Sequence, residues 1–408
     1  MAPAEPVELY DMMSNPLQTV IRNGTLLTPA RRIPDGVVVS TGTKITAVGK
    51  RGRVSEPDDA TVVDADGNYI VPGLIDIHVH GSNGGDVMEA TVDALETMSS
   101  FFVTRGVTSF LATSLTASDD KLLGVLECVR QVVSGDGLSG AEVLGVHQEG
   151  PFLNVAQKGA HPLELLVLPT PARYEKFLPY ADVLRIMTLA PELDGAVKLI
   201  GELRKADIVA ALGHSHGIAR TITPGIDAGV THAVHDFCNM STLRRDNLKR
   251  VAGAVETVLY DDRVTTELIG DGWHVGDTLM KLAVKVKGPQ RVAFVTDAMM
   301  AAGMGPGRYM LGEVEAVVED GIARLPDNTA YASSVTTLDV CVRNGIGRMG
   351  LSIDDAVRMA TLTPAGIISV EDRKGSLEPG KDADIVIMDQ NAKVLKTFVR
   401  GKQAFSAE

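Results

Sequence analysis

The sequence predicts an α/β protein built as a (β/α)8 TIM-like barrel, with a small composite β-sandwich domain contributed by both ends of the chain. Three observations support this fold class. Apolar strand-like runs alternate with amphipathic helical stretches through the middle of the chain, as in parallel βα units. Eight such runs fall within residues 71–374, a length that suits a (β/α)8 barrel. Short β-like segments with turn residues occupy both ends of the chain.

The small domain is expected from residues 17–70 together with residues 375–408. The first part contains TVIRNGTLLTP, DGVVVSTGTKITAVG and ATVVDADGNYIVPG, each bounded by Asn-Gly, Asp-Gly or Gly-Thr turns. The last part, GSLEPGKDADIVIMDQNAKVLKTFVRGKQAF, repeats this pattern. We therefore expect the two ends to share one β domain.

The barrel domain, residues 71–374, carries the eight predicted strands. In order they are LIDIHVH (74–80), VTSFLAT (107–113), EVLGVHQ (142–148), VLRIMTL (183–189), DIVAALG (207–213), VTHAVHD (230–236), VTTELIG (264–270) and RVAFVTD (291–297). Helical stretches such as TVDALETMSSFFVTRG and DKLLGVLECVRQVV lie between them. A doubly wound sheet is the competing architecture, but no GxGxxG follows the first strand.

The composition is that of a globular protein. Of 408 residues, 45% are hydrophobic and 22% are charged, and the formal net charge is −13 without a long basic run. Such an acidic chain is not expected to have nucleic acid or an anionic membrane surface as its main partner. The three cysteines are scattered, no apolar run approaches the length of a membrane span, and the N-terminus MAPAEPVELYDMM lacks signal-peptide features. We therefore expect the protein in the reducing cytoplasm.

Polar side chains gather at the C-terminal ends of the predicted strands, where a (β/α)8 barrel has its active site. His78 and His80 end the first strand, and residues one apart in an extended chain point to the same side. Imidazole and carboxylate groups suit zinc, iron or manganese. We therefore expect a divalent metal site formed by this group of residues, whose other members are His147, Glu149, His214, His232, His235 and Asp297.

Asp297, in FVTDAM at the end of the eighth strand, is the candidate base of this site. A hydrolytic metal centre needs a group that takes a proton from water. The alternative is that Asp297 caps a helix beginning at AMMAAG. His232 and His235 have opposite parity on the sixth strand, so only one of them is expected to face the site. The local sequence does not decide between these two.

Eight motifs spread over nearly the whole chain carry a family resemblance. They are VPGLIDIHVHG, HQEGPFLNVAQKGAH, LGHSHG, AGVTHAVH, TELIGDGWHV, VTDAMMAAGMGPGRYMLG, YASSVTTLDVCVRN and GSLEPGKDADIVIMD. In these motifs the chain resembles the N-acetylglucosamine-6-phosphate deacetylase family of the amidohydrolase superfamily. HxEGPF followed by KGAH is specific to this family.

The resemblance implies a role for each candidate residue. Glu149, His214 and His235 would bind the principal divalent ion, and His78 and His80 with Glu149 would bind a second one. The expected metal is zinc, with iron and manganese as alternatives. His161 and His274 would contact the substrate, and Asp297 would act as the base and then protonate the departing amine.

The activity implied by the resemblance is hydrolysis of N-acetylglucosamine 6-phosphate to glucosamine 6-phosphate and acetate. The partner would be this small amino sugar phosphate, and the resemblance also implies a homodimer. In such a dimer, the divergent segment 241–250 is where a residue of the neighbouring subunit would reach the phosphate.

The chain departs from the family after the sixth strand. Relatives have a sequence close to LFNAMSPLHHREPG where this chain has DFCNMSTLRRDNLKR. Cys238 and Asn239 stand in place of the Asn and Ala that help hold the sugar phosphate. Arg244 and Arg245 either bind the phosphate through their guanidinium groups or form a solvated charged surface. N-acetylgalactosamine 6-phosphate or another N-acyl amino sugar is therefore an alternative substrate.

Two rival functions are compatible with the same fold. The first is another amidohydrolase reaction, either cyclic-amide hydrolysis or deamination. VLRIMTLAP offers no lysine to bridge two metals as in many cyclic-amide hydrolases, although Glu149 can supply the bridging carboxylate. The second is a non-catalytic scaffold, since a fold alone does not confer activity. Such a scaffold is expected to have lost ligands or the base, and here all are present.

Overall fold

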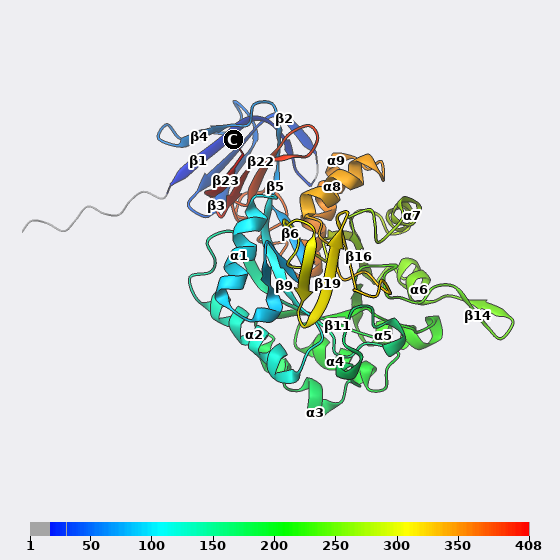
Figure 1. Ribbon diagram of the computed structural model, residues 1–408. Coiled ribbons are helices and arrows are strands. Elements are labelled where there is room, and N and C mark those ends of the chain that lie inside the picture. The colour runs from blue at the N-terminus through cyan, green and yellow to red at the C-terminus, as the bar shows by residue number, and fades with distance from the viewer. Residues whose placement is uncertain (1–16, 30, 408) are drawn as a thin grey trace, which may run out of the picture.

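The computed structural model of the chain describes residues 17–29 and 31–407. Figure 1 shows a barrel of strands surrounded by helices, with a separate β-sheet at one end of it. The separate sheet combines segments from both ends of the chain, coloured blue and red in the figure. The segment MAPAEPVELYDMM, in which no signal peptide is expected, lies outside the described residues.

The barrel contains the eight predicted strands, all parallel, and the predicted fold class is confirmed. The sixth strand, predicted to reach residue 236, ends earlier because the chain leaves the extended conformation before His235, where φ is +27°. The strands are β6 (Leu74–Val79), β9 (Val107–Ser114), β10 (Glu142–Glu149), β11 (Leu184–Leu189), β12 (Val209–Leu212), β13 (Val230–Ala233), β16 (Thr265–Ile269) and β17 (Val292–Val295).

The barrel closes where the ends of β17 and β6 meet. The amide of Asp297 donates a hydrogen bond of 2.8 Å to the carbonyl oxygen of His78. Val79 and Ala298 form a parallel bridge at the same place. This closure places residues of the first and last barrel strands next to each other, although they lie far apart in the sequence.

Apolar side chains fill the barrel and cover its outer surface. Strand residues alternate between the two sides, so that Leu74 packs in the outer layer with the helices while Ile75 belongs to the inner cluster. The helices are α1 (Val92–Val103), α2 (Asp119–Ser134), α3 (Pro171–Tyr174), α4 (Ala196–Lys205), α5 (Ala219–Ala228), α6 (Ala254–Tyr260), α7 (Asp277–Lys287), α8 (Leu338–Gly347), α9 (Ile353–Met359) and α10 (Leu362–Ile367). None of the described helices combines the length and apolar character needed to cross a membrane.

The separate sheet joins the two ends of the chain by direct strand pairing. β5 lies between β1 and β21, and Ile70 pairs with Ile387 across that junction. One face carries a cluster that includes Ile21, Val38 and Ile387, while Val20 and Val39 lie in a cluster of their own, as alternation along a strand requires. The strands are β1 (Gln18–Leu27), β2 (Arg32–Thr41), β3 (Lys44–Lys50), β4 (Thr61–Asp64), β5 (Tyr69–Pro72), β21 (Ile385–Met388), β22 (Val394–Val399) and β23 (Lys402–Ser406).

Short strands outside these two sheets were not among the predicted elements. After β17 the chain forms a three-stranded sheet next to the barrel mouth, and after β13 it forms a hairpin that extends away from the body of the molecule (Figure 1). The sheet consists of β18 (Gly307–Leu311), β19 (Val314–Glu319) and β20 (Ile322–Arg324). The hairpin consists of β14 (Arg244–Asp246) and β15 (Lys249–Val251), and a smaller pair of β7 (Gly81–Ser82) and β8 (Gly85–Asp86) follows β6.

Candidate active site

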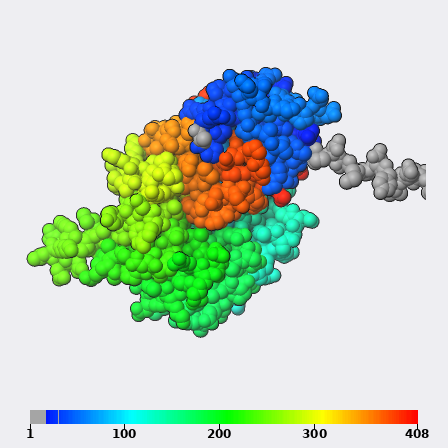
Figure 2. Space-filling model, turned by 180° about the vertical axis from the view of Figure 1, so that it is seen from behind, coloured from blue at the N-terminus to red at the C-terminus, as the bar shows by residue number. Residues whose placement is uncertain are grey.

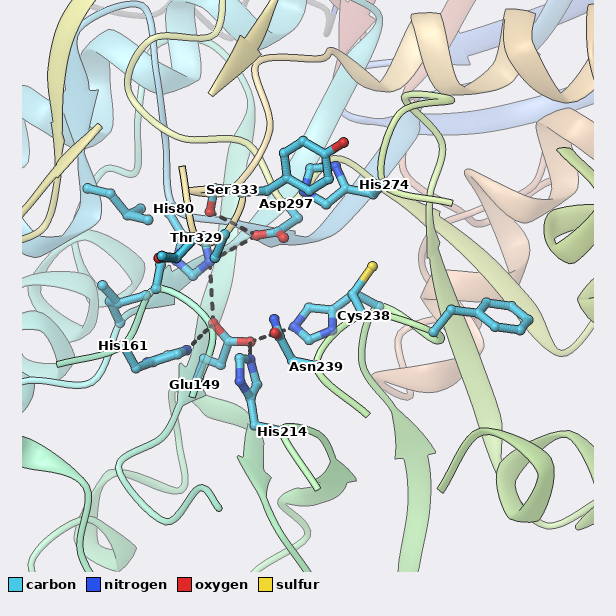
Figure 3. Close-up of a pocket in the computed structure, with 17 residues that line it drawn as sticks. His80, Glu149, His161, His214, Cys238, Asn239, His274, Asp297, Thr329 and Ser333 are labelled. Atoms are coloured by element: carbon cyan, nitrogen blue, oxygen red, sulfur yellow. Dashed lines mark hydrogen bonds and ion pairs between the residues drawn. The ribbon is translucent and has the colours of Figure 1, made fainter. Parts of the chain in front are cut away.

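A cavity of about 300 Å³ opens at the C-terminal ends of the barrel strands. Figure 3 shows the side chains that line it. His78 is fully buried beside the cavity, and Arg244 and Arg245 are not among its lining residues. The sequence-predicted residues that do line it are His80, Glu149, His161, His214, His235, Asn239, His274 and Asp297.

Glu149, the last residue of β10, is the centre of this cluster. Its carboxylate faces the Nε2 atoms of five histidines, which come from the ends of β6, β12 and β13 and from the loop after β10. Figure 3 shows His80, His161 and His214 around Glu149. From Oε1 the distances are 2.9 Å to His235, 3.2 Å to His214 and 3.6 Å to His78. From Oε2 they are 3.4 Å to His161 and 3.5 Å to His80.

Three of the side chains occupy the same position relative to their strands. His214, His235 and Asp297 each lie two residues beyond the end of β12, β13 and β17. Each has a positive φ, of 48°, 27° and 46° respectively. This backbone region is strained for residues other than glycine and tends to occur at functional sites. The strained turns direct these side chains into the cavity from three strand ends.

Gly213 permits the turn before His214. A Cβ atom at this position would lie 2.3 Å from a methyl group of Val234 and 2.6 Å from one of Thr188. Only glycine fits there without moving two neighbouring strands, so the end of β12 can pack tightly while His214 turns inward.

Asp297 lies beside the histidines, with its carboxylate at the cavity wall. Its Oδ1 is 3.1 Å from His80 Nε2 and 3.8 Å from His78 Nε2. Burial alone would raise the pKa of Asp297, but the hydrogen bond with His80 and the charge of His78 hold that pKa below its ordinary value. Residues 298–304, which follow Asp297, contain an isolated β-bridge at Ala298 and then turns, but no helix. Asp297 therefore does not cap a helix.

Glu149 is also held in its ionised form. Burial opposes its ionisation, yet the charge of His78 and the hydrogen bonds with His161 and His214 keep the pKa of Glu149 well below its ordinary value. Burial lowers the pKa of His161 to about 4. His161 is therefore neutral near neutral pH.

The cluster fits a divalent metal ion. The facing atoms of His78, His80 and Glu149 all lie within 4.8 Å of one another, as do those of Glu149, His161 and His214. His78 Nε2 is buried without a hydrogen-bond partner among the described residues. An unsatisfied buried polar atom is costly, and binding a ligand would remove that cost. Imidazole and carboxylate donors together suit a divalent transition-metal ion or zinc.

Glu267, on β16, supports the cluster from inside the barrel and is absent from the sequence-based site. It is fully buried. Its Oε2 is 2.8 Å from His78 Nδ1 and accepts a hydrogen bond of 3.1 Å from the His235 amide. A signal was available in the sequence, because Glu267 is the only charged residue in the predicted strand VTTELIG.

His232 and His147 face the barrel interior instead of the cavity. His232 contacts Glu267 Oε1 at 3.0 Å and Thr265 Oγ1 at 2.8 Å. Of the two histidines near the end of the sixth strand, it is therefore His235 that faces Glu149. His147 lies 2.7 Å from Thr188 Oγ1, and burial lowers the pKa of His147 to about 3, so its ring is neutral.

The outer part of the cavity is lined by residues of the divergent segment and of later loops. His274 Nδ1 lies 2.7 Å from a carboxylate oxygen of Asp271, and its ring centroid is 4.5 Å from that of Tyr331. Cys238 and Asn239 also line the cavity, and burial raises the pKa of the Cys238 thiol. Neither lysine nor arginine is among the lining residues in the described part of the chain.

Arg244 and Arg245 lie instead on the hairpin formed by β14 and β15. Figure 2 shows this green segment projecting from the surface, away from the barrel. Arg244 Nη1 lies 2.9 Å from Nε2 of His216, and Arg220 forms an ion pair of 2.9 Å with Asp246, which lies next to the turn of the hairpin. The two arginines therefore do not enter the cavity of their own chain.

Comparison with known proteins identifies the relatives of the chain. Residues 69–404 match the Amidohydrolase family. The chain is 33% identical to N-acetylglucosamine-6-phosphate deacetylase of Bacillus subtilis (strain 168), with 95% of this chain and 97% of the relative covered. It is 34% identical to N-acetylgalactosamine-6-phosphate deacetylase of Escherichia coli O157:H7, with 91% and 94% covered.

Solved structures of similar proteins share the fold over nearly the whole chain. The crystal structure of N-acetylglucosamine-6-phosphate deacetylase from Pasteurella multocida matches with a TM-score of 0.89 at 28% identity, covering 96% of this chain and 100% of that one. A mutant of the Mycobacterium smegmatis enzyme in complex with N-acetyl-D-glucosamine-6-phosphate matches with a TM-score of 0.87 at 30% identity, covering 96% and 100%.

Proposed function

The chain belongs to the amidohydrolase family and, within it, to the N-acetylglucosamine-6-phosphate deacetylases, and from this premise we propose that the cavity at the barrel mouth is its catalytic site. The protein is a hydrolase of a carbon–nitrogen bond and converts N-acetylglucosamine 6-phosphate to glucosamine 6-phosphate and acetate. The observation that carries the assignment of the site is the convergence of five histidine Nε2 atoms on Glu149, beside the carboxylate of Asp297.

Metal binding is proposed for the residues around Glu149. Glu149, His214 and His235 would hold the principal ion, and His78 and His80 with Glu149 would hold a second one. Zinc is the proposed metal because histidine and glutamate are among its usual ligands, with iron and manganese as alternatives. A divalent ion bound here would lower the pKa of a water molecule and polarise the acetyl carbonyl group.

Asp297 is proposed as the residue that moves the proton. Its depressed pKa makes it a carboxylate at neutral pH, and its position on the cavity wall gives it access to the reacting groups. It accepts a proton from the attacking water and then gives that proton to the amine nitrogen as the amide bond breaks. His161 and His274, which line the same cavity, are proposed to contact the substrate.

The phosphate of the substrate is an anion that a lysine or arginine side chain would bind well. No lysine or arginine lines the cavity among the described residues, whereas the hairpin carries Arg244, Arg245, Lys249 and Arg250. We therefore propose a homodimer in which the hairpin of one subunit reaches the cavity of its partner. Exposed apolar side chains support this, since Leu248 on the hairpin is 93% exposed and Tyr260 on α6 is 88% exposed.

Asn239 and Cys238 are proposed to contact the sugar phosphate, because both line the cavity within the divergent segment. N-acetylgalactosamine 6-phosphate is a second candidate substrate, because the relative from Escherichia coli O157:H7 is an N-acetylgalactosamine-6-phosphate deacetylase. A cytoplasmic location is proposed as well, because all three cysteines are free thiols.

Acetate release by metal-loaded protein tests the function directly. We expect strong preference for N-acetylglucosamine 6-phosphate over its galactosamine epimer and over unphosphorylated N-acetylglucosamine. Equal rates with and without the phosphate would contradict the proposed phosphate contacts. Absence of acetate from all three compounds, with metal bound, would reject the sugar as substrate.

A further inference from the structure

We propose that Ser333 is a positioning residue that orients the carboxylate of Asp297, an inference that rests on the proposed role of Asp297 in proton transfer. Ser333 lies in the loop after β20 and lines the cavity. Its hydroxyl group donates a hydrogen bond of 3.1 Å to Oδ1 of Asp297, drawn as a dashed line in Figure 3. The contact joins the cavity-lining loop to the end of the last barrel strand.

Ser333 differs from the other neighbours of Asp297 Oδ1. These are His80 Nε2 at 3.1 Å and His78 Nε2 at 3.8 Å, both on residues proposed as metal ligands. The hydroxyl of Ser333 is the donor whose hydrogen bond does not compete with metal binding. Among the described residues, no hydrogen bond reaches Oδ2 of Asp297. Ser333 thus holds one carboxylate oxygen and leaves the other free to take the proton.

The backbone at Ser333 is strained. Its φ is +61°, a left-handed conformation that glycine adopts freely and serine does not. The neighbouring residues enforce it, because Ser334 donates from its amide to the Asp297 carbonyl at 2.8 Å and from its hydroxyl to the Thr296 carbonyl at 2.6 Å. Serine is less favourable than glycine for this backbone conformation, but it supplies a hydroxyl group that glycine lacks. The hydrogen bond to Asp297 gives that hydroxyl a function.

Two variants of Ser333 separate its hydroxyl from its backbone strain. Ser333→Ala removes the hydroxyl and keeps the strain, while Ser333→Gly removes both. Ser369→Gly is the matched control, because Ser369 also has a positive φ, of 56°, and is exposed outside the cavity. The measurements are kcat and KM for acetate release from N-acetylglucosamine 6-phosphate, together with Tm.

We expect both Ser333 variants to lower kcat roughly 10-fold, the order expected for losing a hydrogen bond to a charged group, with KM nearly unchanged. Ser333→Gly and Ser369→Gly should both have a Tm at or above that of the unmodified protein, and Ser369→Gly should keep full kcat. Thus Ser333→Gly should be at least as stable and yet slower, a combination that a purely structural role would not produce.

The opposite results are equally clear. Unchanged kcat in both Ser333 variants, with an active parent enzyme, would overturn the positioning role and leave the proposed function intact. A change in KM with constant kcat would mean that Ser333 contacts the substrate instead. Absence of turnover in the parent enzyme would overturn the proposed function, and this inference with it.

Discussion

At the scale of single residues, the two carboxylates of the cavity have different surroundings and so different proposed tasks. Glu149 is surrounded by five histidines and is 2% exposed, which suits a residue that binds metal. Asp297 is 8% exposed, contacts the same group through one oxygen only, and lines the cavity. Substitution at the two positions should therefore affect different properties of the enzyme.

Asp297→Asn should retain metal but lower kcat by roughly 10³-fold or more, because the amide neither accepts nor returns the proton. Metal content of the purified protein and acetate release are the two measurements. Glu149→Gln is the matched comparison and should lose metal as well as turnover. Turnover close to normal in Asp297→Asn would remove this residue as the base, and full metal content in Glu149→Gln would contradict the ligand assignment.

Glu267 should control metal binding without touching the metal. Its carboxylate contacts two histidine rings, and the contact of 2.8 Å with Nδ1 holds the His78 ring with Nε2 directed at Glu149, so that Nε2 is the atom available to a metal when the ring is neutral. An amide is neutral and offers one acceptor oxygen in place of two, so it holds the His78 ring less strongly than the carboxylate does. Glu267→Gln is therefore expected to weaken metal binding about 10- to 100-fold, as measured by competition with a chelator.

Thr188→Val is a suitable control for that experiment. Thr188 is also fully buried, and its hydroxyl group contacts His147 at 2.7 Å, a histidine that is not among the proposed ligands. The control should keep its metal affinity even where stability falls. Equal loss of metal in both variants would indicate general damage to the barrel rather than a specific role for Glu267.

At the scale of elements, the periodic parts of the chain could be predicted and the irregular parts could not. All eight barrel strands are confirmed, because buried parallel strands are apolar runs of recognisable length. The sheet of β18–β20 could not be predicted because its strands are short and mostly exposed. A strand such as GRYML, with only its last residue buried, does not show the alternation of apolar and polar residues that identifies a strand. The loop that presents Ser333 follows this sheet, so that contact with Asp297 could not be predicted either.

The same reasoning explains which site residues were found. His214, His235 and Asp297 follow strand ends, so the barrel topology alone brings them to one rim. Arg244 and Arg245 belong to a hairpin, and no rule of topology states where a hairpin points. Their placement away from the cavity depends on the three-dimensional course of the chain after β13.

The hairpin of β14 and β15 should matter for assembly and for phosphate binding together. Leu248→Asp places a charge at its exposed tip and is expected to shift a homodimer towards monomer. The KM for the phosphorylated sugar should then rise roughly 10-fold if basic residues of the partner hairpin contact the phosphate. Light scattering coupled to size-exclusion chromatography gives the mass, and acetate release gives the KM.

Val197→Asp provides a control for that variant. Val197 lies on α4 and is also exposed, but it is not on the hairpin. It should leave both mass and KM unchanged. The proposed dimer would be contradicted if the unmodified protein were monomeric and its KM equalled that of Leu248→Asp.

At the scale of the whole molecule, a buried ionic cluster links the barrel to the separate sheet. Lys374 is 1% exposed, and its ammonium lies 2.6 Å from Asp384, 2.8 Å from Glu142 and 3.1 Å from Asp382. Glu142 begins barrel strand β10, whereas Asp382 and Asp384 precede β21 of the sheet. Oppositely charged groups from the two parts thus neutralise one another at the junction. A buried charge without a partner would be strongly unfavourable.

Lys374→Met should destabilise the protein by about 3–5 kcal/mol at pH 7, because it leaves buried carboxylates without their central cation. The free energy of unfolding from urea titration is the measurement. Arg308→Met is the control, since Arg308 pairs with Glu315 on the surface and should cost less than about 1 kcal/mol.

The effect of Lys374→Met should also depend on pH in a definite direction. Burial opposes ionisation of Glu142 and Asp382, but Lys374 and Arg373 hold the pKa of both carboxyl groups below their ordinary values. Groups whose pKa is depressed on folding contribute stability above their unfolded pKa and lose it as the pH falls through the folded pKa. In the variant, protonation also relieves the unpaired carboxylates. The stability difference between the two proteins should therefore narrow from pH 7 to pH 4, and a constant difference over that range would show that Lys374 acts through packing and not through its charge.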